Sequence, residues 1–109
     1  GQAAAGATAF DKAYAEAQRL TRAASGAAVS SDPWVAAQAA ISALESARND
    51  SVSALAALDT LYTARVSAIA DGKMSGSVDA IDAARASAIA TVDSQNDRLD
   101  ALRAMLAPD

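Results

Sequence analysis

Apolar residues recur at intervals of three and four along most of this chain, the spacing that places them on one face of an α-helix. In the first segment these positions are Phe10, Tyr14, Ala17, Leu20 and Ala24. Gly26 follows directly, and glycine commonly ends a helix because it adopts a left-handed backbone conformation without strain. The pattern predicts a first helix over residues 3–25.

The second segment opens on a clear start signal. Ser31 and Asp32 are capping residues, and Pro33 suits the first helical turn, where its missing N–H needs no partner. The larger apolar positions that follow are Ile41, Leu44, Val52, Leu55, Leu58, Tyr62, Val66 and Ile69. Gly72 is a suitable C-terminal cap for this segment.

The middle of this second segment is polar and decides how many helices the chain has. Residues 45–51 lack large apolar side chains, but they include neither glycine nor proline. We therefore expect one long helix over residues 33–71. The alternative is a break near Asn49 and Asp50, which would produce a four-helix bundle.

A third apolar stripe follows Ser77, a candidate N-cap, with Asp79 and Asp82 near the positive end of the helix dipole. Its members are Val78, Ile81, Ala88, Val92, Leu99, Leu102 and Leu106, which predict a helix over residues 77–106. Short connections imply antiparallel neighbours, and a spacing near 3.5 favours shallow packing. We expect one all-α domain over residues 1–109, an antiparallel up-down-up three-helix bundle with coiled-coil-like packing.

Composition limits the chemistry that this domain can perform. About three in ten of its 109 residues are alanine, and histidine and cysteine are absent. Histidine-dependent triads, haem ligation by histidine, di-iron Glu-x-x-His sites and thiol catalysis are therefore excluded. The sequence also has no phosphate-binding glycine loop and no dinucleotide fingerprint. We expect no catalytic residue, no metal site and no cofactor, so that the protein is not an enzyme.

Charge and the N-terminal residues bear on partners and location. The net charge is −4, and the nine basic residues are scattered from Lys12 to Arg103, which argues against nucleic acid as a partner. No apolar run approaches the roughly 20 residues of a transmembrane helix. The start, Gly1-Gln2-Ala3-Ala4-Ala5, is compatible with a cleaved leader peptide, and the composition with a GC-rich bacterial genome. We expect a periplasmic or otherwise exported protein, with a cytoplasmic location as the alternative.

The three expected helices differ in length, at about 35, 58 and 45 Å. The first helix then covers only the early part of the second and leaves its most apolar stretch beside the third alone. The residues of that stretch are Leu55, Leu58, Leu61, Tyr62, Val66 and Ile69. Because so large a stripe is unusual on a monomer, we expect it to bind a second copy or another protein. The alternative is that it is buried within the chain.

A polar layer crosses the expected core near its middle. Arg48, Ser51 and Gln95 fall on or beside the apolar stripes, and hairpin geometry places Arg48 near Asp97 and Asp100. The layer either binds a charged ligand through Arg48 or fixes the alignment of the helices at a cost in stability. The second interpretation is favoured, because no other feature converges on a pocket.

Trp34 is the only tryptophan and a second candidate ligand-binding residue. It lies in the first turn of the second helix, where it either stacks on a ligand or closes the end of the bundle. Together these patterns predict a non-catalytic structural or protein-interaction helical module. The alternative is a helical bundle that binds a small ligand through Trp34 or Arg48.

Overall fold

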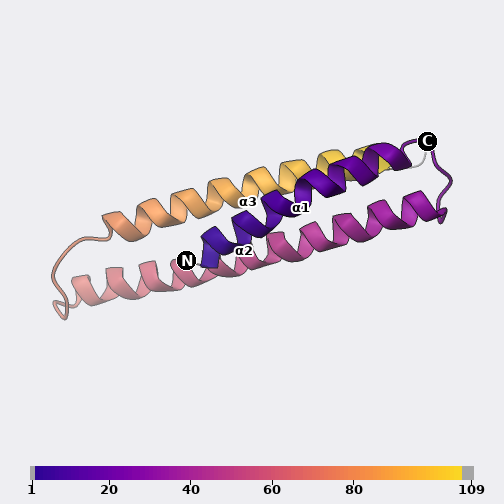
Figure 1. Ribbon diagram of the computed structural model, residues 1–109. Helices are drawn as coiled ribbons and strands as arrows, with labels where there is room; N and C mark the ends of the chain where they lie inside the picture. The colour runs from indigo at the N-terminus through magenta and orange to yellow at the C-terminus, as the bar shows by residue number, and fades with distance from the viewer. Residues whose placement is uncertain (1, 107–109) are drawn as a thin grey trace.

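The computed structural model describes the backbone of residues 2–106 and the side chains of residues 8–106. The chain forms three helices, α1 (Gln2–Ala24), α2 (Asp32–Ala70) and α3 (Asp79–Leu106), and no strand occurs among these residues. They run up, down and up as an antiparallel bundle of 62 × 23 × 16 Å (Figure 1). The expected all-α three-helix bundle is confirmed, with helix bounds that differ from the predicted ones by two residues at most.

α2 is a single helix of 39 residues, so the four-helix alternative is wrong. The polar stretch in its middle does not break it, because its charged and amide side chains are exposed or half-buried. Asn49 and Asp50 are exposed, whereas Ala47 and Ser51 are buried in the bundle. The stretch is amphipathic at helical spacing, which favours a continuous helix.

Local caps account for the helix ends. After α2, Gly72 has a φ of +72° and donates its N–H to Ile69 O at 3.1 Å, while Lys73 N–H reaches Ala68 O at 2.9 Å. This pair of bonds is the Schellman motif, and its left-handed position favours glycine. Before α3, the N–H of Asp79 donates to Ser77 Oγ at 3.3 Å. Ser31 occupies the N-cap of α2, but its side chain makes no capping hydrogen bond.

The buried core lies where all three helices run together. Phe10 and Leu99 are completely buried there, and the apolar core residues are Phe10, Ala17, Ala24, Ala37, Ile41, Leu44, Ala47, Leu99, Leu102 and Leu106. Because four of these ten are alanine, the core is small and the helices approach closely. We call this part the body. It comprises α1, residues 32–54 of α2 and residues 93–106 of α3.

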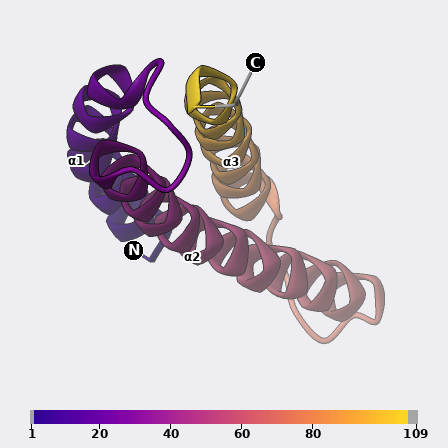
Figure 2. The ribbon, with the colours of Figure 1, turned by 90° about the vertical axis from the view of Figure 1, so that its right-hand side faces the viewer.

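Beyond the body, α2 and α3 continue as a two-helix arm. It comprises residues 55–70 of α2, residues 79–92 of α3 and the turn between them. Figure 1 shows α1 beginning near the middle of α2, and Figure 2 shows the far ends of α2 and α3 without a third helix beside them. The unequal helix lengths expected from the sequence thus leave about 24 Å of hairpin uncovered.

Candidate protein-interaction surface

One line of α2 residues passes from the body into the arm and changes from buried to exposed. Ala47 and Ala54 are 8% and 4% exposed, and Leu61, one heptad further along the same face, is 56% exposed. Residues seven apart share a helical face, so Leu61 has the same orientation as the two buried alanines. Its side chain is exposed because α1 does not extend to its level.

α3 shows the same transition. Arg98 faces α1, where its guanidinium binds Asp11 at 3.0 Å and lies 4.5 Å and 5.1 Å from the ring centres of Phe10 and Tyr14. Thr91 and Ala84 are one and two heptads earlier, on the same face of α3 but in the arm. Thr91 is half-buried and Ala84 exposed. The surface on which α1 packs therefore continues along both arm helices.

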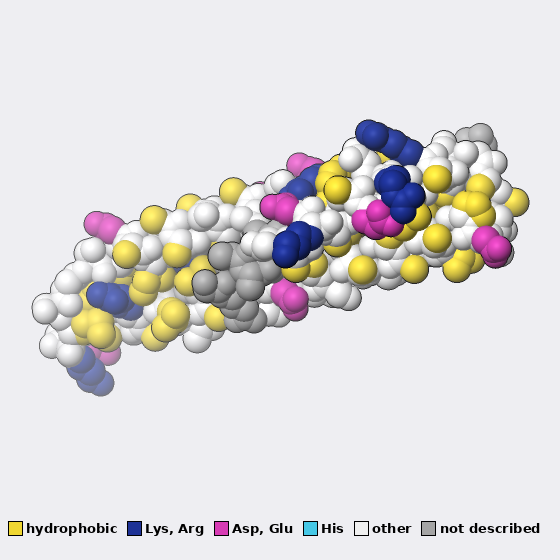
Figure 3. Space-filling view, in the orientation of Figure 1, with side chains coloured by type: hydrophobic (Ala, Val, Ile, Leu, Met, Phe, Trp, Pro, Cys, Tyr) yellow, Lys and Arg dark blue, Asp and Glu magenta, His cyan; other side chains and the backbone are white. Residues whose placement is uncertain are grey.

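We call this continuation the arm face. Its residues are Ala57, Leu58, Leu61, Ala64 and Ala68 of α2 with Ala84, Ala88 and Thr91 of α3. They are small or aliphatic, and none of them is charged. Figure 3 views the molecule from the side that carries α1 and shows hydrophobic side chains extending along the arm to its tip. Arg65, one heptad after Leu58, lies on the same face; it is half-buried, and its Nε has no hydrogen-bond partner in the described part of the chain.

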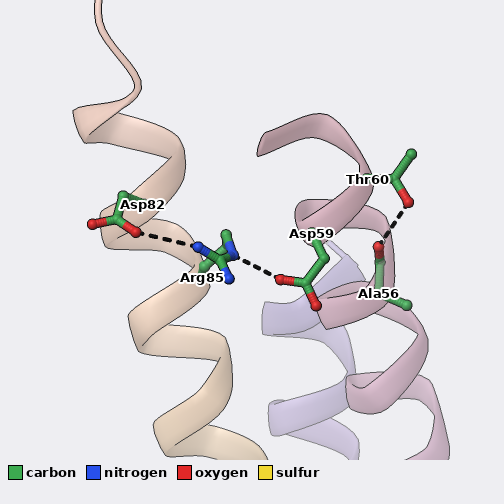
Figure 4. A network of polar contacts seen from close by, with 5 residues as sticks. All are labelled: Ala56, Asp59, Thr60, Asp82 and Arg85. Carbon is green, nitrogen blue, oxygen red and sulfur yellow. Dashed lines mark hydrogen bonds and ion pairs between the residues drawn. The ribbon is translucent and has the colours of Figure 1, made fainter. Parts of the chain in front are cut away.

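Charged groups of the arm pair with each other on its opposite side. Arg85 Nε donates to Asp59 at 2.7 Å and its Nη1 lies 3.3 Å from Asp82 (Figure 4). The same guanidinium stacks over Tyr62, 4.4 Å from the ring centre. The hydrogen bond to Asp59, more than any other contact, raises the pKa of Arg85 above its ordinary value. Arg85 therefore stays charged and ties α3 to α2 along this side.

The six residues predicted to bind a partner do not share one surface of the arm. Four of them are half-buried, namely Leu55, Leu58, Tyr62 and Ile69. Three of these four share the heptad position of Arg48, which bonds to α3: Leu55, Tyr62 and Ile69. Leu61 lies on the arm face. Val66 is 40% exposed, but it shares the heptad position of Asp59 and so belongs to the charged side. Leu61 is therefore the predicted residue most available to a partner on the arm face.

The predicted polar layer is present where the body meets the arm. Ser51 is 1% exposed and Gln95 0%, and they lie at about the same level of the α2–α3 hairpin. Ser51 Oγ and both side-chain polar atoms of Gln95 have no hydrogen-bond partner in the described part of the chain. An unpaired buried amide costs free energy, so this layer lowers the stability of the bundle.

Arg48 lies beside this layer, with a different partner from the expected ones. Its Nη1 donates to Asn96 Oδ1 at 2.5 Å and its Nε to Asn49 Oδ1 at 3.0 Å. Among the described residues Arg48 forms no ion pair with Asp97 or Asp100, and the α3 side chain that it bonds to is Asn96. The guanidinium already has two neutral amide partners, and this arrangement gives no sign of a ligand site.

Trp34 is half-buried and packs against the core at the end of the body that is remote from the arm. Its Nε1 is buried and has no hydrogen-bond partner among the described residues. Trp34 and Arg48 are 14 residues apart on one continuous helix, or about 21 Å. The two candidate ligand-binding residues thus do not belong to one site.

Within residues 8–106, no three or more acidic residues lie close enough together to hold a metal ion. None of the described helices is long and apolar enough to span a bilayer. Comparison with protein-family models, curated proteins and solved structures finds no match to this chain.

Proposed function

We propose that this chain is a non-catalytic protein-interaction module that binds a helical partner through the arm face. The observation that carries the proposal is the exposure of Leu61, on the same helical face as the buried Ala47 and Ala54. Within the body this face accepts a helix, α1. In the arm it offers the same small and aliphatic residues with no helix of the described chain beside them.

The distribution of charge supports this choice of surface. The paired charges Asp59, Asp82 and Arg85 lie on the other side of the arm, where they remain hydrated. A partner on the arm face thus leaves these ion pairs in water, without the desolvation that costs several kcal/mol per ion, and meets one charged side chain, Arg65. Alanines at the contact let helix backbones approach closely, and their dispersion contacts add up over the length of the arm.

Site-specific photocrosslinking in cells that naturally produce the protein tests this function. A photoreactive residue at position 61 is expected to give covalent adducts with protein. The matched control is position 89, because Ile89 is a similar side chain, 42% exposed, in the other arm helix. Ile89 shares the heptad position of Asp82 and therefore lies on the charged side. Adduct yields at position 61 no higher than at position 89 would contradict the proposal.

A second prediction separates binding from folding. Leu61→Glu is expected to change the free energy of unfolding by less than about 0.5 kcal/mol, because the side chain is mostly exposed. The same substitution is expected to abolish the adducts obtained from a photoreactive residue at position 57. Chemical denaturation followed by circular dichroism measures the first effect. A large loss of stability would instead mean that Leu61 belongs to the folded core.

A further inference from the structure

Arg65 is a cation on the arm face whose hydrogen-bonding groups are not all satisfied. Its side chain is half-buried, and its Nε is shielded from water with no acceptor among the described residues. Its Nη2 lies 3.5 Å from the place that a Cβ on Gly76 would occupy, so the guanidinium lies beside the turn at the tip of the arm. Because an arginine cannot lose its proton in a protein, Arg65 carries the cost of this partial desolvation as a permanent charge.

The other arginine of the arm has carboxylate partners. Arg85 binds Asp59 at 2.7 Å and Asp82 at 3.3 Å. These two acidic residues are thus already engaged on the opposite side of the arm. Arg65 forms no ion pair with any carboxylate of the described residues, and its Nε has no hydrogen bond. An acceptor for Arg65 therefore has to come from outside the described part of the chain.

The spacing of Arg65 and Leu61 connects this cation to the proposed binding surface. The two residues are four apart on α2, so their side chains are neighbours, one helical turn from each other. Leu58 and Ala68 lie on the same face before and after them. A helix that packs on Leu61 therefore also covers Arg65. It either supplies an acceptor there or buries the guanidinium without one, which costs several kcal/mol.

The carboxylate of an aspartate or glutamate is the acceptor that suits this position. A carboxylate binds a guanidinium through two parallel charge-assisted hydrogen bonds, whereas a lysine or arginine there would be repelled. A nucleic acid or an anionic membrane requires several basic residues together, but the arm face offers Arg65 alone and the chain has a net charge of −4. A second copy does not supply the acceptor through its own arm face, because no carboxylate lies on that face.

We propose that the arm face binds a helix of another protein that carries an aspartate or glutamate on its apolar contact side, and that this carboxylate pairs with Arg65. The acidic residue lies about one helical turn from the apolar residue that packs on Leu61. This inference rests on the proposed function and defines the chemistry of the partner. The ion pair fixes the register of the bound helix and excludes partners with a basic residue at that place.

Carbodiimide coupling tests for the carboxylate directly. This reagent joins a lysine amine to a carboxylate in contact with it; an amide forms, and the reagent takes up the lost water as a urea. In an extract of the cells that produce the protein, Arg65→Lys is expected to yield adducts in which mass spectrometry finds the lysine linked to an aspartate or glutamate of another protein. The matched control is Arg85→Lys, which is expected to couple within its own chain, to Asp59 or Asp82.

Charge reversal provides an independent measurement. Arg65→Glu is expected to lower the adduct yield from a photoreactive residue at position 61 at least about tenfold, because two carboxylates then face each other. Arg65→Gln, which removes the charge without reversing it, is expected to have a smaller effect. The control Arg22→Glu changes the net charge of the chain equally at an exposed position of α1 and is expected to leave the yield unchanged. Circular dichroism verifies that each variant is folded.

These results separate the carboxylate partner from the proposed function. An unchanged yield at position 61 in folded Arg65→Glu, or no coupling of the lysine at position 65 to another protein, would overturn the inference and leave the proposed function standing. Coupling to a carboxylate of a second copy would overturn it as well. If position 61 gives no adducts even in the otherwise unmodified chain, both the inference and the proposed function fail.

Discussion

Phe10→Ala is expected to lower the free energy of unfolding by about 3–5 kcal/mol, the usual cost of removing a buried aromatic side chain. Phe10 is completely buried and stacks on Tyr14 with 6.2 Å between ring centres. Arg98 of α3 lies over its ring at 4.5 Å, so Phe10 joins α1 to α3. Domains of this size are stable by about 5–15 kcal/mol, so the loss is a large part of the total.

Denaturant unfolding monitored by far-ultraviolet circular dichroism measures this change. The matched control is Leu61→Ala, which also truncates an apolar side chain but at a mostly exposed position of the arm. Its expected effect is below about 0.5 kcal/mol. Similar losses in the two variants would mean that Leu61 is packed in solution as firmly as Phe10. That result would contradict an arm face that is free in the monomer.

The three helices could be predicted from the sequence because their ends have explicit chemistry. Gly26 and Gly72 both adopt the positive φ expected of helix-ending glycines, at +81° and +72°. Ser77 supplies the oxygen that accepts a hydrogen bond at the start of α3. Glycine conformation and hydroxyl capping depend on only a few neighbouring residues, so both can be recognised in the sequence without knowledge of the tertiary structure.

The partner of Arg48 could not be predicted in the same way. Spacing places Arg48 near residues 96–100 of the third helix, but the rotation of that helix about its axis decides which side chain faces it. Asn96 and Asp97 are neighbours in sequence and point about 100° apart on a helix. That rotation follows from packing among all three helices, including the contact between Arg98 and Phe10.

The exposed positions of the arm could be predicted only in part, for a related reason. Leu61 and Val66 both belong to the apolar stripe of the sequence, yet they are five residues apart and point about 140° away from each other. One neighbouring helix covers the middle of such a wide stripe and leaves its two edges on opposite sides. The contribution of α3, through Ala84 and Thr91, was missed. Ala84 and Thr91 share the heptad position of Arg98. This relation places them on the arm face only once Arg98 is known to face α1.

Gln95→Leu is expected to raise the free energy of unfolding by about 1–3 kcal/mol, because it removes a completely buried amide whose two polar atoms have no partner. For a domain of this size, each kcal/mol corresponds to a rise in Tm of about 4–8 °C, which calorimetry resolves. The control is Gln38→Leu at an exposed position of α2, where the expected change is below about 0.5 kcal/mol.

The position of Gln95 explains why the chain keeps a buried amide that lowers its stability. Gln95 lies where the three-helix body passes into the two-helix arm. A polar layer there penalises any sliding of α3 along α2 that would move the amide among purely apolar residues. The stabilised Gln95→Leu variant is therefore expected to populate additional helix alignments, seen as extra or broadened amide resonances in α3. A stabilised variant with one sharp set of resonances would show that the layer does not fix the alignment. A destabilised variant would mean that the amide is hydrogen-bonded in solution.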